Sequence, residues 1–247
     1  MRRRWIADTV SPPTGHPTHA ALTGEQALHL ARVLRAEPGQ IFDVVAAGFL
    51  HRAEITAVTN DRVDFELHEE LESDSALPLH LYLAIFKFDH LEWAIEKATE
   101  LGVAQITPVL ARRTEKHLTQ AAVKRVDRWR RIAHEASQQS RRTSVPTIAD
   151  PTPLKLAIAS EIAPTRILLS ETEQTLTLSQ HLGAPRLDSE TWDRTAALAI
   201  GPEGGWTPEE MFLFTTHNWT HVTLGPRILR AETAAIAAIA IAGTFIR

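Results

Sequence analysis

Up to residue 71 the chain alternates apolar and polar residues in short runs, which is the pattern of strands with one buried face. Strands are predicted at residues 41–46, 50–58 and 63–67, and turn-forming residues separate them at 37–39 and 60–61. Several short strands joined by tight turns favour a small β-barrel or β-sandwich.

From residue 79 onward, strand-like runs alternate with segments of helical periodicity. The predicted strands are 79–86, 103–110, 166–170, 196–200 and 220–224, and the predicted helices are 89–101, 119–140, a segment beginning at Pro208, and the apolar stretch 234–246. This alternation is typical of an α/β fold, in which helices cover a parallel sheet. The acidic stretch 69–75 lies between the two patterns and is interpreted as a linker.

The ends of two helices carry local signals. Asp89 is expected to cap the helix that Gly102 terminates. Thr207, Pro208 and Glu210 form the pattern of a capping box with proline in the first turn. A helix is therefore expected to begin at Pro208.

The composition limits the possible chemistry. The 247 residues contain no cysteine, which excludes disulfides, thiolate metal sites and a cysteine nucleophile. Twelve histidines are present, but none lies in a metal-binding motif, so no metal is expected. The first residues have no apolar core of the kind that a signal peptide requires, and the stretch 234–246 is too short to span a bilayer. We therefore expect a cytoplasmic protein that does not enter a membrane.

Positive charge is concentrated in one segment. The whole chain carries a net charge of −4, but residues 112–142 hold ten Lys and Arg against three acids, a local charge of +7. Because affinity for a phosphate backbone depends on the local patch, this segment can bind RNA despite the negative total. The same pattern also fits a solvated helix face.

Two glycine-containing segments each join a predicted strand to a predicted helix. Residues 201–206 read GPEGGW, and residues 224–230 read LGPRILR. Glycine lets a backbone approach a ligand closely, because no side chain stands in the way. Neither segment matches the phosphate-binding P-loop or the glycine fingerprint of dinucleotide-binding folds. The first segment alone is also compatible with a plain turn.

Together these segments resemble the cofactor-binding loops of the SPOUT methyltransferases. The sequence GPEGGW followed by LGPRILRAETA is similar, more closely still, to the ribosomal RNA small-subunit methyltransferase E family. Three further blocks are similar to that family: HLARVLR at 29–35 with Gly39 after it, Lys87 with KATELGV at 97–103, and the basic segment 128–142, which Pro146 follows. Five blocks in the family's order, spread over nearly the whole chain, make the resemblance specific.

The resemblance implies a fold and a function. The fold would be a SPOUT-type parallel α/β sheet with a C-terminal trefoil knot, preceded by a small PUA-like β-barrel. Residues 1–72 would form the RNA-binding domain and residues 73–247 the methyltransferase domain. The function would be methyl transfer from S-adenosyl-L-methionine to N3 of a uridine in 16S rRNA, within the 30S subunit and by a homodimer. Two alternatives remain open: a ribose 2′-O-methyltransferase of the same fold, and a non-catalytic RNA-binding assembly factor.

The expected cofactor site combines the two glycine segments with the end of the strand at 166–170. It comprises Leu169, Ser170, Gly201, Pro202, Glu203, Gly204, Gly205, Leu224, Gly225, Arg227, Ile228, Leu229 and Arg230. Uridine N3 must lose its proton, and Glu203 or Glu232 could accept it. Arg230 or Arg227 could stabilise charge on the neighbouring carbonyl oxygens. Alternatively, Glu203 could bond amides of its own turn, and Glu232 could complement the dipole of the last helix.

The basic residues expected to contact rRNA lie in several blocks. They are Arg32, Arg35, Lys87, Arg128, Arg131, Arg141 and Arg142. Because His29, Arg32 and Arg35 are at helical spacing, they could form one face that meets phosphates. Trp129 is expected to lie in the core, since apolar residues flank it at helical spacing.

Overall fold

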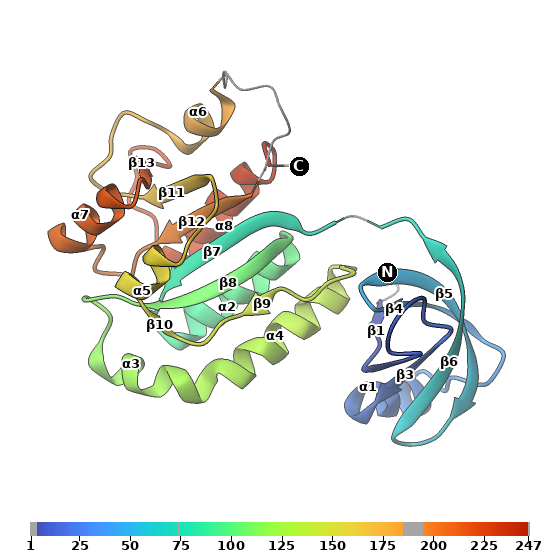
Figure 1. The fold of residues 1–247 in the computed structure, drawn as a ribbon. Coiled ribbons are helices and arrows are strands. Elements are labelled where there is room, and N and C mark those ends of the chain that lie inside the picture. The colour runs from blue at the N-terminus through green and yellow to red at the C-terminus, as the bar shows by residue number, and fades with distance from the viewer. Residues whose placement is uncertain (1–3, 74, 185–194, 247) are drawn as a thin grey trace. The chain divides into compact units, whose positions relative to one another are not determined.

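The computed structural model describes residues 4–73, 75–184 and 195–246, and Figure 1 shows its ribbon. The chain divides into two compact units, one made of Met1–Ser75 with Ser137–Ser144 and the other of Ala76–Ala136 with Val145–Arg247. The sequence pattern does not predict the second piece of the first unit, which includes the end of the basic helix. Across the described ranges, no helix is both long and apolar enough to cross a membrane.

The first unit contains a six-stranded sheet in the order β1-β4-β5-β6-β3-β2. Its strands are β1 (Trp5–Ile6), β2 (Thr9–Ser11), β3 (His19–Thr23), β4 (Ile41–Ala46), β5 (Phe49–Val58) and β6 (Arg62–Leu71). A short helix, α1 (Gly24–Leu28), and a π-helical turn, η1 (His29–Val33), follow β3. β1 runs parallel to β4, and the other pairs are antiparallel.

The two edge strands of this sheet, β1 and β2, are consecutive in the chain. Ala7 and Asp8 separate them; the amide of Ala7 donates to Val45 O at 2.8 Å, and the amide of Asp8 donates to Ala21 O at 3.0 Å. The chain thus passes directly from one edge of the sheet to the other and closes it into a barrel. Its interior is filled by apolar side chains that include Trp5, Leu22, Ile55 and Phe65. The predicted small β-domain is confirmed.

The strands of the barrel follow the sequence pattern closely. β4 has the predicted bounds, and β5 begins one residue before the predicted start. β6 is longer than predicted, because the pairing of His51 with Glu70 and of Leu50 with Leu71 continues its ladder. The interpretation of the whole stretch 69–75 as a linker is therefore wrong for its first residues.

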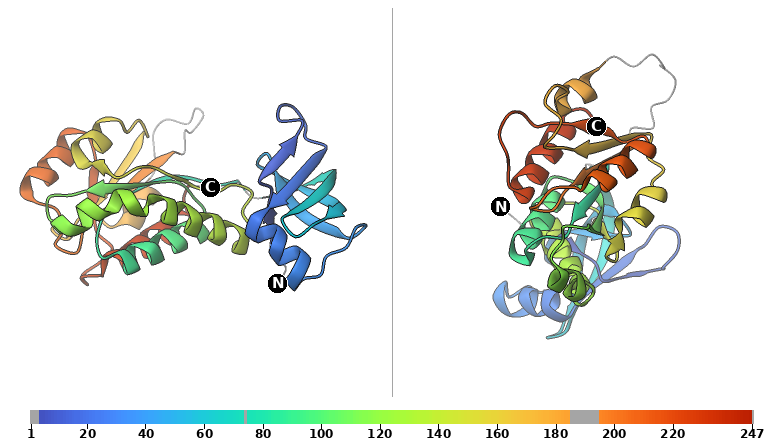
Figure 2. Two further views of the ribbon diagram at one scale, coloured as in Figure 1. Left: turned by 90° about the horizontal axis from the view of Figure 1, so that it is seen from below. Right: turned by 90° about the vertical axis from the view of Figure 1, so that its left-hand side faces the viewer.

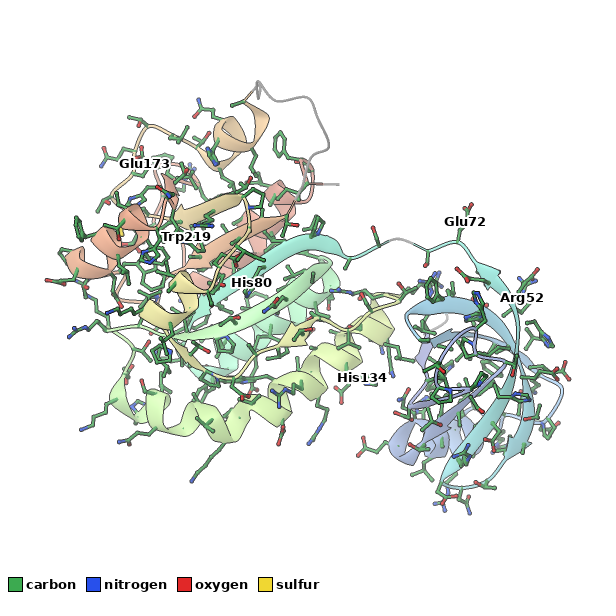
Figure 3. All side chains as sticks on the ribbon, in the orientation of Figure 1. Arg52, Glu72, His80, His134, Glu173 and Trp219 are labelled. Carbon is green, nitrogen blue, oxygen red and sulfur yellow. The ribbon has the colours of Figure 1, made fainter. Side chains whose placement is uncertain are left out.

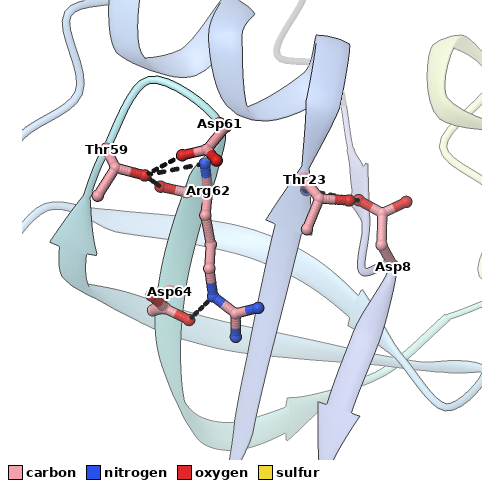
Figure 4. A network of polar contacts seen from close by, with 6 residues as sticks. All are labelled: Asp8, Thr23, Thr59, Asp61, Arg62 and Asp64. Carbon is pink, nitrogen blue, oxygen red and sulfur yellow. Dashed lines mark hydrogen bonds and ion pairs between the residues drawn. The ribbon is translucent and has the colours of Figure 1, made fainter.

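Polar side chains fix two places in the barrel (Figure 4). The Asp8 carboxylate accepts hydrogen bonds from the amide and the hydroxyl of Thr23, at 2.6 and 3.1 Å. In the turn between β5 and β6, the Thr59 hydroxyl donates to Asp61 at 2.9 Å and accepts from the amide of Arg62 at 3.0 Å. The predicted turn is thus closed by its own side chains, which sets the register of the hairpin.

The second unit contains a parallel sheet in the order β10-β8-β7-β12-β11-β13, with β9 pairing beside β8. Its strands are β7 (Leu77–Ala84), β8 (Val103–Leu110), β9 (Thr147–Ile148), β10 (Thr152–Pro153), β11 (Thr165–Leu169), β12 (Ala196–Ile200) and β13 (Thr220–Val222). The helices are α2 (Phe88–Glu100), α3 (Lys116–Ala122), α4 (Val126–Gln139), α5 (Leu154–Ala159), α6 (Leu178–Gly183), α7 (Pro208–Thr216) and α8 (Ala231–Ala242). The predicted parallel α/β sheet is confirmed.

Helices cover both faces of this sheet (Figure 2). Side chains alternate along β7: Leu79, Leu81 and Leu83 pack with α2, α4 and α8, whereas Tyr82 and Ala84 pack with α5 and α7. Because both faces are buried, the central strands are largely apolar, as parallel strands usually are. Trp129 of α4 is fully buried, as predicted.

Two helix predictions need correction. The segment 119–140 is not one helix: it begins earlier, at Lys116, and a 3₁₀ turn (Val123–Arg125) separates α3 from α4. Buried Ala122 and Val126 keep helical spacing across that turn, so the periodicity does not reveal it. Asp89 does not cap α2, which begins at Phe88, and instead lies in the first turn, where a carboxylate complements the helix dipole.

Candidate active site

The carboxyl ends of the parallel strands lie at one edge of the sheet. β11 ends at Leu169, β12 at Ile200 and β13 at Val222, and these three strands are direct neighbours in the order β12-β11-β13. The segments that follow them are Ser170 onward and the two glycine loops, here called the first loop (201–207) and the second loop (223–230). The structure therefore brings together the three segments that the sequence singles out.

The first loop is packed against its own side chains. A Cβ atom built on Gly201 would lie 3.1 Å from Nε1 of Trp206, so the indole fills the space beside this glycine. Gly205 has a φ of +69°, and its amide donates to Pro202 O at 2.8 Å, which closes the turn. The loop conformation is thus set by glycine, by the turn hydrogen bond and by one buried aromatic ring.

The first loop leads into α7 through the predicted capping box. The Thr207 hydroxyl accepts from the amide of Glu210 at 3.3 Å, and the Glu210 carboxylate accepts from the amide of Thr207 at 2.9 Å. Pro208 is the first residue of the helix. The capping-box prediction is confirmed, and Glu210 is additionally buried.

Two arginines after β8 contact the first loop and the helix that follows it, and the sequence alone does not predict these contacts. The backbone amide of Arg112 donates to Glu210 Oε1 at 2.7 Å, and the guanidinium of Arg113 donates from NH1 to Gly204 O at 2.6 Å. A signal for them does exist in the sequence. They follow the predicted strand 103–110, and parallel strands end at the same edge of a sheet.

The second loop is open by comparison. Gly225 has a φ of +115°, and a Cβ atom built on it would have no other atom within 4 Å. Its amide donates to the Thr223 hydroxyl at 3.2 Å. Arg227, Ile228 and Arg230 are exposed, and Ile228 keeps 85% of its surface accessible although it is apolar. This loop therefore leaves unfilled space beside its glycine.

The segment after β11 is tied by a carboxylate, Glu173 (Figure 3). Its Oε1 accepts hydrogen bonds from the hydroxyl and the amide of Thr175, at 2.6 and 2.8 Å, and from the amide of Leu176 at 2.9 Å. These bonds, with the Thr175 hydroxyl contributing most, lower the pKa of Glu173 to about 2. Ser170 is buried, and its hydroxyl lies 2.9 Å from that of Thr172. Leu169, by contrast, is only partly buried.

The two candidate bases lie in different surroundings. Glu203, at the tip of the first loop, is exposed, and its carboxylate has no hydrogen-bond partner among the described residues. Glu232, in the first turn of α8, is 3% exposed, and its Oε1 lies 3.0 Å from Nδ1 of His90 in α2. His90 was not identified from the sequence, because nothing in its neighbourhood indicates a distant partner.

The candidate RNA-binding residues are divided between the two units. Arg32, Arg35, Arg141 and Arg142 belong to the first unit, and Lys87, Arg128 and Arg131 belong to the second. All are exposed except Arg142.

Three of these residues differ from the sequence expectation. Arg35 does not continue a helix with Arg32, because η1 ends at Val33 and Arg35 has a φ of +49°. Arg142 is 9% exposed, and burial lowers the pKa of its guanidinium to about 10. Arg128 donates from Nε to Glu92 at 2.8 Å, so part of its charge is neutralised.

A separate buried polar cluster contains His80 (Figure 3). The Glu161 carboxylate accepts from Tyr82 at 2.8 Å and lies 2.7 Å from His80 Nδ1. Burial alone would raise the pKa of Glu161, but hydrogen bonds from His80, the amide of Ala163 and Tyr82 outweigh it and lower the pKa to about 2. Because Glu161 precedes β11, this cluster lies at the amino end of that strand and belongs to the fold, not to the loops.

Comparison with known proteins decides the family. The model of an RNA methyltransferase domain matches residues 73–243, and the model of an RNA methyltransferase PUA domain matches residues 22–67. The ribosomal RNA small subunit methyltransferase E of Bacillus subtilis is 31% identical over 243 residues, which cover 97% of this chain and 94% of that protein. The chain belongs to the ribosomal RNA small subunit methyltransferase E family.

Other members of the methyltransferase E family agree in sequence and in structure. The protein of Synechocystis is 34% identical over 221 residues, which cover 89% of this chain and 71% of the relative. The crystal structure of the family member from Neisseria gonorrhoeae, bound to S-adenosyl methionine, superimposes with a TM-score of 0.80. It is 28% identical and covers 99% of this chain and 98% of its own. The barrel followed by a parallel α/β sheet is thus the architecture of the family.

Proposed function

We propose that this chain transfers a methyl group from S-adenosylmethionine to N3 of a uridine in 16S rRNA, within the assembled 30S subunit. The observation that carries the proposal is the convergence of both glycine loops and the end of β11 at one sheet edge, in a chain of the methyltransferase E family. In open α/β sheets, ligands bind at the carboxyl ends of the strands, where loops from neighbouring strands meet.

The residues at this edge fit S-adenosylmethionine. The space beside Gly225 is open, so a bound molecule can approach the backbone of the second loop there. The first loop offers the backbone of Gly201–Gly205 in a conformation that Trp206 and the capping box support. We assign binding to these two loops and to Leu169 and Ser170.

The chemistry requires a donor, a proton acceptor and stabilisation of charge. S-adenosylmethionine, when bound, supplies a methyl group on a positively charged sulfur. We assign Glu203 as the acceptor of the N3 proton, because its carboxylate is exposed and makes no hydrogen bond among the described residues. Arg227 and Arg230 are exposed on the second loop and would stabilise charge on the uridine oxygens. Glu232 is too buried to meet a substrate, so we assign it a positioning role through His90.

Binding of rRNA is assigned to the barrel and to the basic residues that remain exposed. The domain of residues 1–72 would grip the RNA, and residues 73–247 would carry the reaction. Arg32, Arg35, Arg131 and Arg141 are exposed and suited to phosphate contact. Lys87 and Arg128 are exposed as well, although Arg128 shares its charge with Glu92. Arg142 is the weakest member of the predicted set, because it is buried.

Two further features of the proposal concern assembly and chain path. We propose a homodimer in which α8, whose sequence is almost wholly Ala and Ile, supplies apolar contact area. We also propose that the C-terminal chain forms the trefoil knot expected for SPOUT enzymes. β12 comes after β7 and β11 in the sequence but lies between them in the sheet, and this placement supports such a path.

The test is methyl transfer from labelled S-adenosylmethionine to unmodified 30S subunits and, in parallel, to naked 16S rRNA. The RNA is digested and the methylated nucleoside is identified by mass spectrometry. We expect 3-methyluridine from 30S subunits and little product from naked rRNA.

Other outcomes would change the proposal in defined ways. A 2′-O-methylated nucleoside would replace base methylation by ribose methylation on the same fold. Measurable cofactor binding without product on either substrate would favour a non-catalytic assembly factor. Equal product from naked rRNA would remove the assembled subunit as the substrate.

A further inference from the structure

Arg113 spans the edge of the sheet to hold the first loop. It follows β8, whereas the first loop follows β12, and β7 lies between these strands in the sheet. Its NH1 donates to Gly204 O at 2.6 Å, a hydrogen bond strengthened by the guanidinium charge. The contact therefore joins two loops that are not neighbours in the sheet.

The aliphatic part of Arg113 packs on the same residue. A Cβ atom built on Gly204 would lie 3.4 Å from both Cβ and Cδ of Arg113, so the side chain covers the face that this glycine leaves bare. NH1 also lies 3.8 Å from the Cβ position of Gly205, where Oε2 of Glu171 is 3.7 Å away. Three loops, after β8, β11 and β12, thus meet at residues 204–205.

The position of Glu203 depends on this contact. Within the described residues, the backbone of the turn has one internal hydrogen bond, from the Gly205 amide to Pro202 O. Gly204 O is the next carbonyl after the exposed Glu203, and Arg113 supplies its bond. Without the guanidinium, two adjacent glycines would let the turn sample several conformations. The Glu203 carboxylate would move with it.

We propose that Arg113 is a positioning residue for methyl transfer, which fixes the 203–205 turn in the conformation that presents Glu203 and the cofactor-facing backbone. The proposal rests on the function proposed above for this edge. In this role Arg113 acts on the geometry of the turn, and not through a general attraction of RNA by positive charge.

Arg112 offers a matched control. It is the preceding residue, has the same charge and is also exposed, but its contact with Glu210 is made by the backbone amide. Removing the side chain of Arg112 therefore subtracts the same charge from the same loop without removing a hydrogen bond to the first loop.

The experiment compares Arg113→Met, Arg113→Lys and Arg112→Met in the full-length protein. The dissociation constant for S-adenosylmethionine is measured by calorimetry, and kcat and KM for 30S subunits are measured over a salt series. We expect Arg113→Met to weaken cofactor binding about tenfold and to lower kcat by a similar factor, as loss of one charge-assisted hydrogen bond predicts. Arg113→Lys should recover part of both, because it keeps a charged donor but not the planar fork. Arg112→Met should change only KM, and less so at high salt.

Two results would overturn the proposal. One is an equal effect of Arg113→Met and Arg112→Met on every constant, which would reduce Arg113 to a general positive charge. The other is unchanged cofactor affinity and kcat in Arg113→Met. The calorimetric measurement needs no RNA, so it tests Arg113 even if the wild-type protein forms no 3-methyluridine. Failure of the proposed function is thereby kept separate from failure of this inference.

Discussion

The two glycine loops use glycine for different reasons. In the first loop, a Cβ atom on Gly201 would meet the Trp206 indole at 3.1 Å, and one on Gly204 would meet Arg113 at 3.4 Å. In the second loop, a Cβ atom on Gly225 would meet nothing within 4 Å, but its φ of +115° is one that other residues rarely adopt. The protein itself fills the space beside the first loop, whereas no other atom of the described residues lies within 4 Å of the Cβ position of Gly225.

The helices that follow the two loops begin in different ways. α7 begins with a complete capping box, in which each partner satisfies an amide of the other. α8 begins at Ala231, and the preceding residue Arg230 provides no side-chain cap. In its first turn, the buried Glu232 carboxylate lies 3.0 Å from Nδ1 of His90. The start of α7 is therefore fixed by a local capping box, whereas the start of α8 is held by a contact with another helix.

The largest effect is expected from Gly225→Val. The substitution strains the backbone and places a side chain in the open space, so the dissociation constant for S-adenosylmethionine should rise about a hundredfold, roughly 2.7 kcal/mol. Calorimetry measures it. Gly48→Val is the matched control: Gly48 has a φ of +88°, has no atom within 4 Å of its Cβ position, and lies in the turn between β4 and β5. It should lower the melting temperature without altering cofactor affinity. A dissociation constant for S-adenosylmethionine that Gly225→Val leaves unchanged would contradict the assignment of the space beside Gly225 to the cofactor.

The second effect tests the packed loop through Gly201→Ala. The new methyl group overpacks against Trp206, which should lower the free energy of unfolding by about 2 kcal/mol. Trp206→Phe removes the indole nitrogen, so the double variant should regain part of the loss. A double-mutant cycle in chemical denaturation measures this coupling. Strictly additive effects would show that the indole does not limit position 201.

A smaller effect is expected from His90→Phe, which tests what holds the second loop. It removes the imidazole that lies 3.0 Å from the buried Glu232 carboxylate, and we expect a loss of about 1–2 kcal/mol in unfolding free energy with a few-fold weaker cofactor binding. His90→Asn keeps a donor near the position of Nδ1 and should restore most of both. If His90→Phe and His90→Asn behave alike, the polar contact between His90 and Glu232 does not stabilise the loop.

The smallest effect is expected from Glu173→Gln, in the segment that follows β11. The pKa of Glu173 is lower in the folded protein, about 2, than its ordinary value of 4.5. Its contribution to stability is therefore complete above pH 4.5 and is lost as the pH falls toward 2. Melting curves of the wild type and the variant should differ above pH 4.5 and converge near pH 2.

The sequence predicts those features of the site whose causes are local. The capping box joins residues only three positions apart, and the apolar runs of β4, β8 and β12 follow from burial, so these strands have the predicted bounds. The glycine loops are recognisable for the same reason. Charge density is also local, and the concentration of Arg and Lys in residues 112–142 can be read without a structure.

What these local patterns do not contain is the order of the strands. The bond from Arg113 to Gly204 and the contact between His90 and Glu232 each join residues far apart in the sequence. They form because β8, β7 and β12 lie side by side and because α2 packs on α8. The burial of Arg142 has the same origin, since a charge run does not show which of its members turns inward.

The sequence by itself therefore determined the two-part α/β architecture, the family and the two glycine loops, because each follows from short-range pattern or motif. Only the tertiary structure decided which loop is packed and which is open, and which arginine and histidine hold them. Those outcomes depend on contacts between segments distant in the chain, and such contacts exist only after the sheet has assembled.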